Sequence, residues 1–192
     1  MAPILTFAMT AAITPGPNNI ILSTNAVNFG FKKTIPLIFG VFFGFLSVLT
    51  LCLLGIGEIY KSFPAISLIL KIIAILFLTY LAIKIFTSSS FSSEKNIKNF
   101  TFKDIYFFQM INPKGVTISM SSSAIFLQNK FSYEIEFILI FICFVISTST
   151  SAVVLAAIGH SFRKYLHDKK KIIYFNRTMA LLLLCSIFFI VI

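Results

Sequence analysis

Long apolar runs, separated by short polar stretches, occupy almost the whole chain. A bilayer core about 30 Å thick is crossed by roughly 20 helical residues, so an apolar run of that length predicts a membrane-spanning helix. Four of the runs are continuous, whereas the first and the fourth contain interruptions. The six predicted spans cover residues 3–27, 35–58, 64–86, 105–128, 134–159 and 173–192.

Proline and glycine interrupt the first and fourth predicted spans. A proline removes a backbone donor and clashes with the preceding turn of a helix, and glycine adopts conformations that other residues avoid. Backbone freed in this way is tolerated inside a bilayer only against protein or water. We therefore predict two discontinuous helices whose breaks leave carbonyl and amide groups free. The interrupting sequences are Pro15-Gly16-Pro17-Asn18-Asn19 in the first span and Asn112-Pro113-Lys114-Gly115 in the fourth.

The composition supports a membrane protein and excludes an ordinary soluble domain. Hydrophobic residues make up 58% of the 192 residues, against about 45–50% in typical globular chains, and the mean hydropathy is +0.97. The net charge of +10 would suggest nucleic acid as the partner of a soluble chain. Here the basic residues lie between apolar runs and form no basic helical face. We therefore predict an all-α integral membrane protein in a lipid bilayer, with no nucleic-acid partner.

The distribution of basic residues over the loops predicts the orientation of the chain. Eleven basic residues lie in the first, third and fifth loops, whereas the second and fourth loops hold only Lys61 and Lys130. Positively charged loops are retained on the cytoplasmic side of a membrane. The pattern therefore predicts six spans with both termini outside the cytoplasm.

The chain divides into two similar halves, which we interpret as repeats within one membrane domain of residues 1–192. The first repeat covers about 1–86, a polar linker covers 87–101, and the second repeat covers about 102–192. Because each half holds three spans, an odd number, the two halves are predicted to be inverted relative to each other, as in many secondary transporters. The landmarks that recur in order are Pro15 with Pro113, Gly57 with Gly159, and Lys71 with Arg177.

The two breaks are the candidate binding site. Free carbonyl groups can accept hydrogen bonds from the ammonium group of a zwitterion such as an amino acid. A helix N-terminus can bind its carboxylate. A basic residue inside a membrane span is costly and usually pairs or faces a cavity. The candidate substrate-binding residues are Pro15, Gly16, Pro17, Asn18, Asn19, Asn112, Pro113, Lys114, Lys71 and Arg177.

Simpler interpretations of the same residues remain open. The breaks would then be packing kinks, and Lys114 would mark the edge of a fourth span that starts later. Lys71 and Arg177 lie near span ends, where their side chains can extend to the membrane surface. The serines and His160 form no nucleophile pattern, and the three cysteines have no metal-binding spacing. We therefore expect neither an enzyme nor a metal or other cofactor.

The motifs resemble the lysine exporter / homoserine–threonine efflux family of bacterial translocators. The resemblance rests on Thr14 to Asn19, Asn28-Phe29-Gly30-Phe31, Asn112-Pro113-Lys114, Leu70-Lys71 with Tyr80-Leu81-Ala82, and Asn176-Arg177. Within the family, the chain looks most similar to the cysteine / O-acetylserine exporter branch at Thr14 to Asn19, at Gly159-His160 with Phe162-Arg163, and at its leucine-rich end.

This resemblance implies a secondary active exporter that moves amino acids or close derivatives out of the cytoplasm of a bacterium. It implies a multi-pass protein of the inner membrane, driven by the proton-motive force, with the substrate held between the two breaks. The nearest candidates for a proton-coupling residue are Glu58 and Asp104. The alternative is a non-transporting membrane scaffold or accessory subunit. Whether the chain forms a homo-oligomer is left open by the sequence.

Overall fold

The computed structural model of this chain describes residues 1–55, 62, 64–88, 100–128, 130–166 and 168–191. Over these residues the secondary structure is helical, without strands. Gly57, Glu58 and Lys61, which entered the sequence interpretation, lie outside the described residues. The helices are α1 (Ala2–Ile13), α2 (Pro17–Phe29), α3 (Phe31–Leu53), α5 (Pro64–Phe86), α6 (Phe102–Ile111), α7 (Pro113–Phe126), α8 (Tyr133–Arg163) and α9 (Lys169–Val191).

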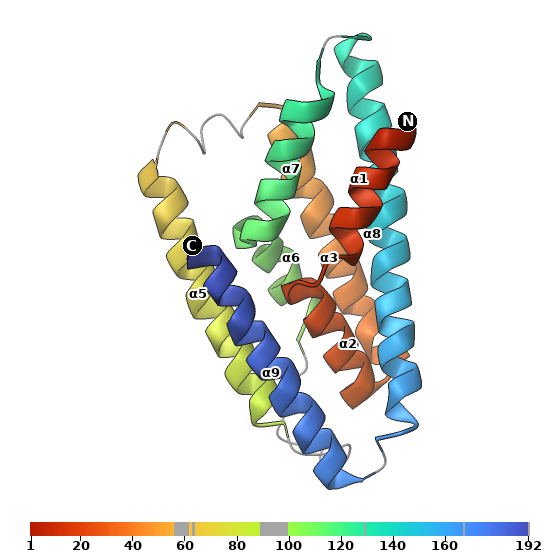
Figure 1. Ribbon diagram of the computed structural model, residues 1–192, viewed down its shortest axis with the longest axis vertical. Coiled ribbons are helices and arrows are strands. Elements are labelled where there is room, and N and C mark those ends of the chain that lie inside the picture. The colour runs from red at the N-terminus through yellow and green to blue at the C-terminus, as the bar shows by residue number, and fades with distance from the viewer. Residues whose placement is uncertain (56–61, 63, 89–99, 129, 167, 192) are drawn as a thin grey trace.

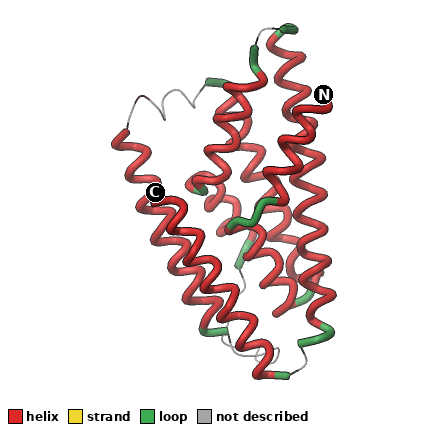
Figure 2. The backbone as a smooth tube through the Cα atoms, in the orientation of Figure 1, coloured by secondary structure: helices red, strands yellow, loops and turns green. Residues whose placement is uncertain are grey.

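Both predicted helix breaks are confirmed. The first predicted span is divided into α1 and α2, and the link between them lies at mid-height in the bundle (Figure 2). The fourth is divided into α6 and α7 at Asn112, whose ψ of 106° is the extended conformation favoured before proline. Pro17 and Pro113 are the first residues of α2 and α7, where a missing backbone N–H costs nothing. Pro17 and Pro113 thus hold the same position in their helices, whereas Pro15 lies in the link before α2.

Three of the described helices are long and apolar enough to cross a membrane on their own. They are the helix Phe31–Leu53, the stretch Leu68–Phe86 and the helix Tyr133–Arg163. Each holds at least 19 residues, close to the roughly 20 that a bilayer core requires. Since the broken segments are pairs of shorter helices, the prediction of six spans stays a prediction.

The two halves of the chain pack into each other. The long helix α3 contacts both parts of the second broken segment, α6 and α7, and α8 contacts both parts of the first, α1 and α2. The remaining helices, α5 and α9, lie side by side along one flank of the bundle (Figure 1). Each broken segment is thus held by a long helix of the other half, which places the two breaks next to each other.

Glycines allow the closest of these helix contacts. A Cβ atom at Gly40 or Gly44 of α3 would lie 2.9 or 2.8 Å from a backbone carbonyl oxygen of α6. At Gly159 of α8, a Cβ atom would lie 2.5 Å from the carbonyl oxygen of Ser23 in α2. Small residues that let two helix backbones approach are typical of helix packing in membranes. Gly40 and Gly44 thus allow α3 and α6 to pack closely.

Basic residues gather at one end of the bundle, the lower end in Figure 1, which we call the basic end. The helices α2, α5 and α8 end there, and α3, α6 and α9 begin there. The other end, called the opposite end below, holds Lys130 among its described residues. The residues of the basic end are Lys32, Lys33, Lys84, Lys103, Arg163, Lys164, Lys169, Lys170 and Lys171.

Candidate functional site

A lysine side chain joins the two helix breaks. Lys114, the second residue of α7, donates a hydrogen bond from Nζ to the carbonyl oxygen of Thr14 at the end of α1. Its stem lies over Gly16, where an added Cβ atom would be only 2.9 Å from the Lys114 Cδ atom. Glycine at position 16 therefore makes room for the lysine that connects the breaks.

A cluster of three amide side chains connects the breaks on a second side. The amides of Asn18 in α2 and Gln109 in α6 exchange two hydrogen bonds, of 2.9 and 3.0 Å. Asn112 donates from Nδ2 to Gln109 Oε1 at 3.3 Å. Gln109 is fully buried and was not among the residues predicted from the sequence. Its position three residues before Asn112, on the same helix face, is a sequence signal that could have identified it.

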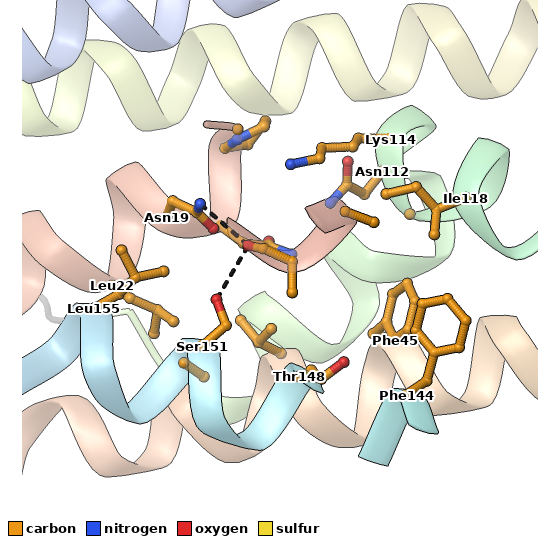
Figure 3. A pocket seen from close by; sticks show the side chains of 18 of the residues that line it. Asn19, Leu22, Phe45, Asn112, Lys114, Ile118, Phe144, Thr148, Ser151 and Leu155 are labelled. Carbon is orange, nitrogen blue, oxygen red and sulfur yellow. Dashed lines mark hydrogen bonds between the residues drawn. The ribbon is translucent and has the colours of Figure 1, made fainter. Parts of the chain in front are cut away.

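The carbonyl groups at the end of α1 are already bonded in this structure. Asn19 donates from Nδ2 to the carbonyls of Ala12, Ile13 and Thr14 at 3.4, 3.3 and 3.1 Å. Ser151 of α8 donates to the Ala12 carbonyl at 3.0 Å, so two side chains converge on one oxygen (Figure 3). The expectation that the first break leaves its carbonyls free is therefore wrong for these three carbonyls, because neighbouring side chains bond them.

Amide groups at the starts of α2 and α7 have no partner within their own helices. The first backbone N–H groups to bond inside these helices belong to Ile20 and Val116. The preceding N–H groups are among the four that any helix leaves unpaired at its N-terminus. Neither Gly16 nor Asn112, the two N-cap residues, makes a side-chain capping bond. Two helix N-termini, each with a partial positive charge, therefore meet at the breaks.

Asn112 also has an unused acceptor. Its side chain is only 1% exposed, and its Oδ1 atom has no hydrogen-bond partner among the described residues. A buried polar atom without a partner is costly and calls for an explanation. A ligand that donates a hydrogen bond at this point would satisfy it.

The breaks line two connected spaces. The inner cavity, of about 60 Å³, lies between α1, α2, α7 and α8. It has room for a few waters rather than for the several hundred Å³ of a typical ligand site. The vestibule, of about 790 Å³, extends from the breaks toward the opposite end, between α1 and α7 on one side and α5 and α9 on the other. Both spaces are lined by Ala11, Gly16, Pro17, Asn112, Lys114 and Ile118.

The walls of the inner cavity are mainly apolar, with a few polar groups (Figure 3). Among the described residues that line either space, lysine supplies the charge and none is acidic. Such a surface has no counter-charge for a cationic side chain. The polar residues of the inner cavity are Asn18, Asn19, Asn112, Lys114, Thr148 and Ser151.

Most of the predicted site residues are brought together, and Arg177 is not. The vestibule contains Pro15, Pro113 and Lys71 in addition to the residues it shares with the inner cavity. Arg177 is exposed and its guanidinium lies 5.1 Å from the centre of the Phe86 ring, near the end of α5. It lines neither of the two spaces.

The expected role of Asp104 in proton coupling finds no support in its surroundings. Asp104 forms a capping box with Thr101 at the start of α6, in which the carboxylate accepts from the Thr101 backbone N–H at 2.8 Å. This arrangement fixes the start of the helix. The other candidate, Glu58, lies outside the described residues.

Comparison with known protein families decides the class of the chain. The family model described as LysE type translocator matches residues 9–191. The chain belongs to the LysE type translocator family. The resemblance of its motifs is thereby confirmed, and this translocator is a multi-pass membrane protein and not an enzyme.

Several curated relatives of this LysE type translocator are named cysteine/O-acetylserine efflux protein. The protein of Salmonella typhimurium strain LT2 is 30% identical over 121 residues, which are 63% of this chain and 62% of the relative. The protein of Shigella flexneri is 30% identical over 132 residues, 66% of this chain and 67% of the relative. The match thus covers less than two thirds of the Salmonella protein. No solved structure matches the chain.

Proposed function

We propose that this LysE type translocator is a secondary active exporter of small amino acids or their close derivatives. The observation that carries the proposal is the convergence of two helix N-termini and Lys114 on the spaces between the breaks. The names of its relatives favour cysteine and O-acetylserine as the first substrates to test. The proposal places the protein in a bacterial inner membrane.

The substrate's carboxylate would bind at the two helix N-termini. The unpaired N–H groups there belong to Asn18 and Asn19 in α2 and to Lys114 and Gly115 in α7, and all four residues line the inner cavity. Anions bind at helix N-termini because the N–H groups point outward and the helix dipole is positive there. The Lys114 ammonium adds a full positive charge on the same side.

The substrate's ammonium group would bind the acceptors that remain. Asn112 Oδ1 is buried in the cavity wall and has no partner among the described residues. Because the α1 carbonyls at the break are already bonded, Asn112 is the more available acceptor. The inner cavity is smaller than a typical ligand site, so the substrate would use the space that the cavity shares with the vestibule.

The predicted orientation of the chain fits the charges at the two ends. The first and fifth loops and the described ends of the third loop lie at the basic end, and the positive-inside pattern assigns this end to the cytoplasm. Under this assignment the vestibule leads from the breaks to the outer face. Inverted repeats of residues 1–86 and 102–192 would explain why α3 holds α6–α7 while α8 holds α1–α2.

We propose that the proton-motive force drives export, and that the coupling group is not a carboxylate among the described residues at the breaks. None of the described residues that line the two spaces is a carboxylate. Flux measured at different imposed pH gradients tests this point, since proton-driven export rises with the gradient. A rate that does not depend on the gradient would exclude it.

Proteoliposomes distinguish an exporter from a non-transporting scaffold or accessory subunit. We expect purified protein to move labelled cysteine or O-acetylserine saturably, and lysine much less, because no described lining residue is acidic. Ser161→Ala serves as a control, since Ser161 is exposed and its hydroxyl bonds its own helix. No saturable movement of any amino acid in a broad panel would favour the scaffold.

A further inference from the structure

The packing of α5 and α9 against the broken helices differs between the two ends of the bundle. Toward the opposite end, the vestibule separates α1 and α7 from α5 and α9. Toward the basic end, the same helix pair, α5 and α9, meets α2 and α6 directly. If the halves are inverted repeats, α2 and α6 are the counterparts of α7 and α1. One of two equivalent spaces is therefore open and the other is filled.

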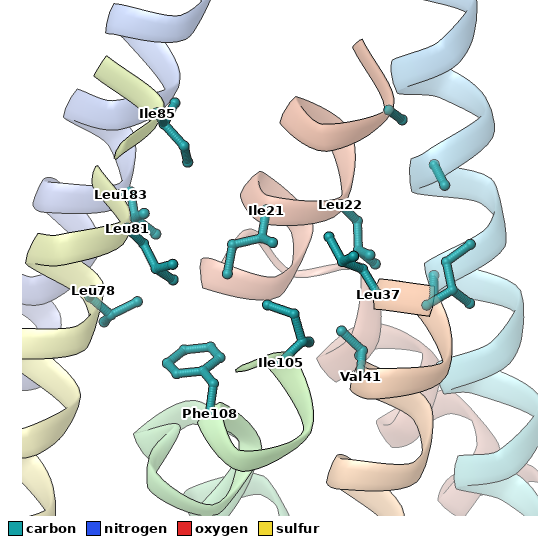
Figure 4. Close-up of a cluster of buried hydrophobic side chains, with 14 of the residues drawn as sticks. Ile21, Leu22, Leu37, Val41, Leu78, Leu81, Ile85, Ile105, Phe108 and Leu183 are labelled. Atoms are coloured by element: carbon teal, nitrogen blue, oxygen red, sulfur yellow. The ribbon is translucent and has the colours of Figure 1, made fainter. Parts of the chain in front are cut away.

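Apolar side chains fill the space toward the basic end. Ile21 of α2, Ile105 and Phe108 of α6, and Leu78 and Leu81 of α5 are each at most 1% exposed and belong to one cluster (Figure 4). Phe108 also stacks on Phe77 of α5, with ring centroids 5.1 Å apart. A substrate at the breaks thus has no open route to the basic end in this conformation.

A pair of asparagines joins the two sides of this closed space. Asn28 near the end of α2 and Asn176 of α9 exchange two hydrogen bonds, of 2.8 and 3.0 Å. Asn176 also donates to the carbonyl oxygen of Ser88, just beyond α5, at 2.9 Å. Both side chains are buried, at 5% and 0% exposure. This contact is polar and long-range, and it ties both helices of the flanking pair to α2.

Hydrogen bonds of this kind suit a contact that must open. Side-chain hydrogen bonds between membrane helices contribute modestly, because alternative partners compete for the same groups. They fix the geometry of the closed state without making separation of the helices prohibitive. An interface closed by apolar contacts alone would lack this specificity.

We propose that Asn28 and Asn176 form the cytoplasmic gate of the export path, a proposal that rests on the proposed function. The gate is closed in this conformation, and it opens when α5 and α9 swing together away from α2 and α6. The swing closes the vestibule on the other side of the breaks. Alternating access of this type is general among transporters with inverted repeats.

The proposed motion opens the path first at one end and then at the other. A basic residue of α5 or α9 lies toward each of these two openings, called mouths here. Lys71 of α5 lines the open vestibule. Arg177 of α9, its counterpart in the repeat, adjoins Asn176 and lies over Phe86 on the side toward the basic end. The flanking pair α5 and α9 thus carries a basic residue toward each mouth, which gives Arg177 a place in the path although it lines neither space in this conformation.

Thiol reactivity tests the gate without requiring transport. The test uses full-length protein in vesicles, with Cys52, Cys143 and Cys185 replaced by serine and with Ile21→Cys as a reporter in the closed space. A membrane-impermeant methanethiosulfonate is added from the side of the basic end. With Asn28→Leu and Asn176→Leu, we expect Ile21→Cys to react at least tenfold faster. A second reporter, Thr117→Cys in the vestibule, should react more slowly from the other side.

Asn25→Leu is the matched control. Asn25 is equally buried in the same helix, and it bonds Thr34 of α3 at 3.0 Å rather than α9. This variant should leave the reactivity of Ile21→Cys unchanged. If the double leucine variant does not fold, Asn176→Asp replaces it, because the carboxylate keeps the size of the amide but cannot donate to Ser88 or Asn28.

The outcomes separate the gate from the proposed function. Unchanged reactivity of both reporters in the folded gate variants would overturn the gate, whether or not the protein exports an amino acid. An equal increase with Asn25→Leu would also overturn it, because the effect would then reflect loosened packing. If Ile21→Cys reacts faster in the gate variants but the unmodified protein exports none of the amino acids tested, the gate stands and the proposed substrate class is refuted.

Discussion

At the scale of single residues, Gln109 connects the two broken segments although the sequence analysis did not select it. Its amide bonds Asn18 from one broken segment and Asn112 from the other, and it is fully buried. These contacts fix the distance between the two helix N-termini. Gln109 therefore positions the groups that are proposed to bind the substrate.

Replacing Gln109 by leucine should weaken both the fold and transport. Leucine has a similar size, but it leaves the amides of Asn18 and Asn112 without their partner, at a cost of about 1–3 kcal/mol for buried polar groups. We expect a lower melting temperature in detergent and a higher KM for export. Gln109→Glu keeps an acceptor for both asparagines and should retain more activity than leucine. Equal activity of the two variants would argue against a positioning role.

At this scale, the sequence predicted which residue types gather at the breaks and not how they bond to one another. Lys114 over Gly16 could not be foreseen, because it depends on how two distant segments pack. The same holds for Asn19, which bonds carbonyls five to seven residues before it because the helix is interrupted between Ile13 and Pro17. Local composition predicts that a helix breaks, whereas the contacts at the break depend on tertiary packing.

At the scale of helices, glycines at two kinds of contact should respond differently to the same substitution. Gly159→Ala places a methyl group 2.5 Å from a backbone oxygen of α2, which cannot move away on its own. We expect a loss of about 1–3 kcal/mol in stability, as for other overpacked interiors. Thermal unfolding of the purified variant in detergent measures this loss.

Gly16→Ala provides the comparison. Its methyl group meets the flexible end of Lys114, 2.9 Å away at Cδ, and residue 16 has an extended backbone that alanine adopts without strain. The lysine can move aside, so we expect nearly normal stability and reduced transport. If Gly16→Ala destabilises the protein as much as Gly159→Ala, the proposed adaptability of Lys114 is wrong.

The helices themselves followed closely from the sequence because their signals are local. Prolines mark the starts of α2, α5 and α7. The length of α8, 31 residues, exceeds its predicted span, since helical structure continues past the apolar run to Arg163. In contrast, α3 packs on α6 and α7, and α8 packs on α1 and α2. No local sequence pattern predicted these contacts between the two halves.

At the scale of the whole molecule, charge asymmetry between the two ends predicts the orientation in the membrane. In a variant without native cysteines, Lys130→Cys should react with an impermeant thiol reagent added outside intact cells. Lys164→Cys, at the basic end, should react only after the cells are opened. Reaction of Lys164→Cys in intact cells would reverse the orientation and, with it, the direction assigned to the vestibule.

For the whole molecule, export as proposed requires that the amino acid binds between the two helix breaks. Equilibrium binding of labelled cysteine and O-acetylserine to the purified protein tests this claim directly. We expect saturable binding that Asn112→Ala weakens at least tenfold, because the unpaired acceptor in the cavity wall is lost, and that Ser161→Ala leaves unchanged. Unaltered affinity in folded Asn112→Ala protein would contradict the account.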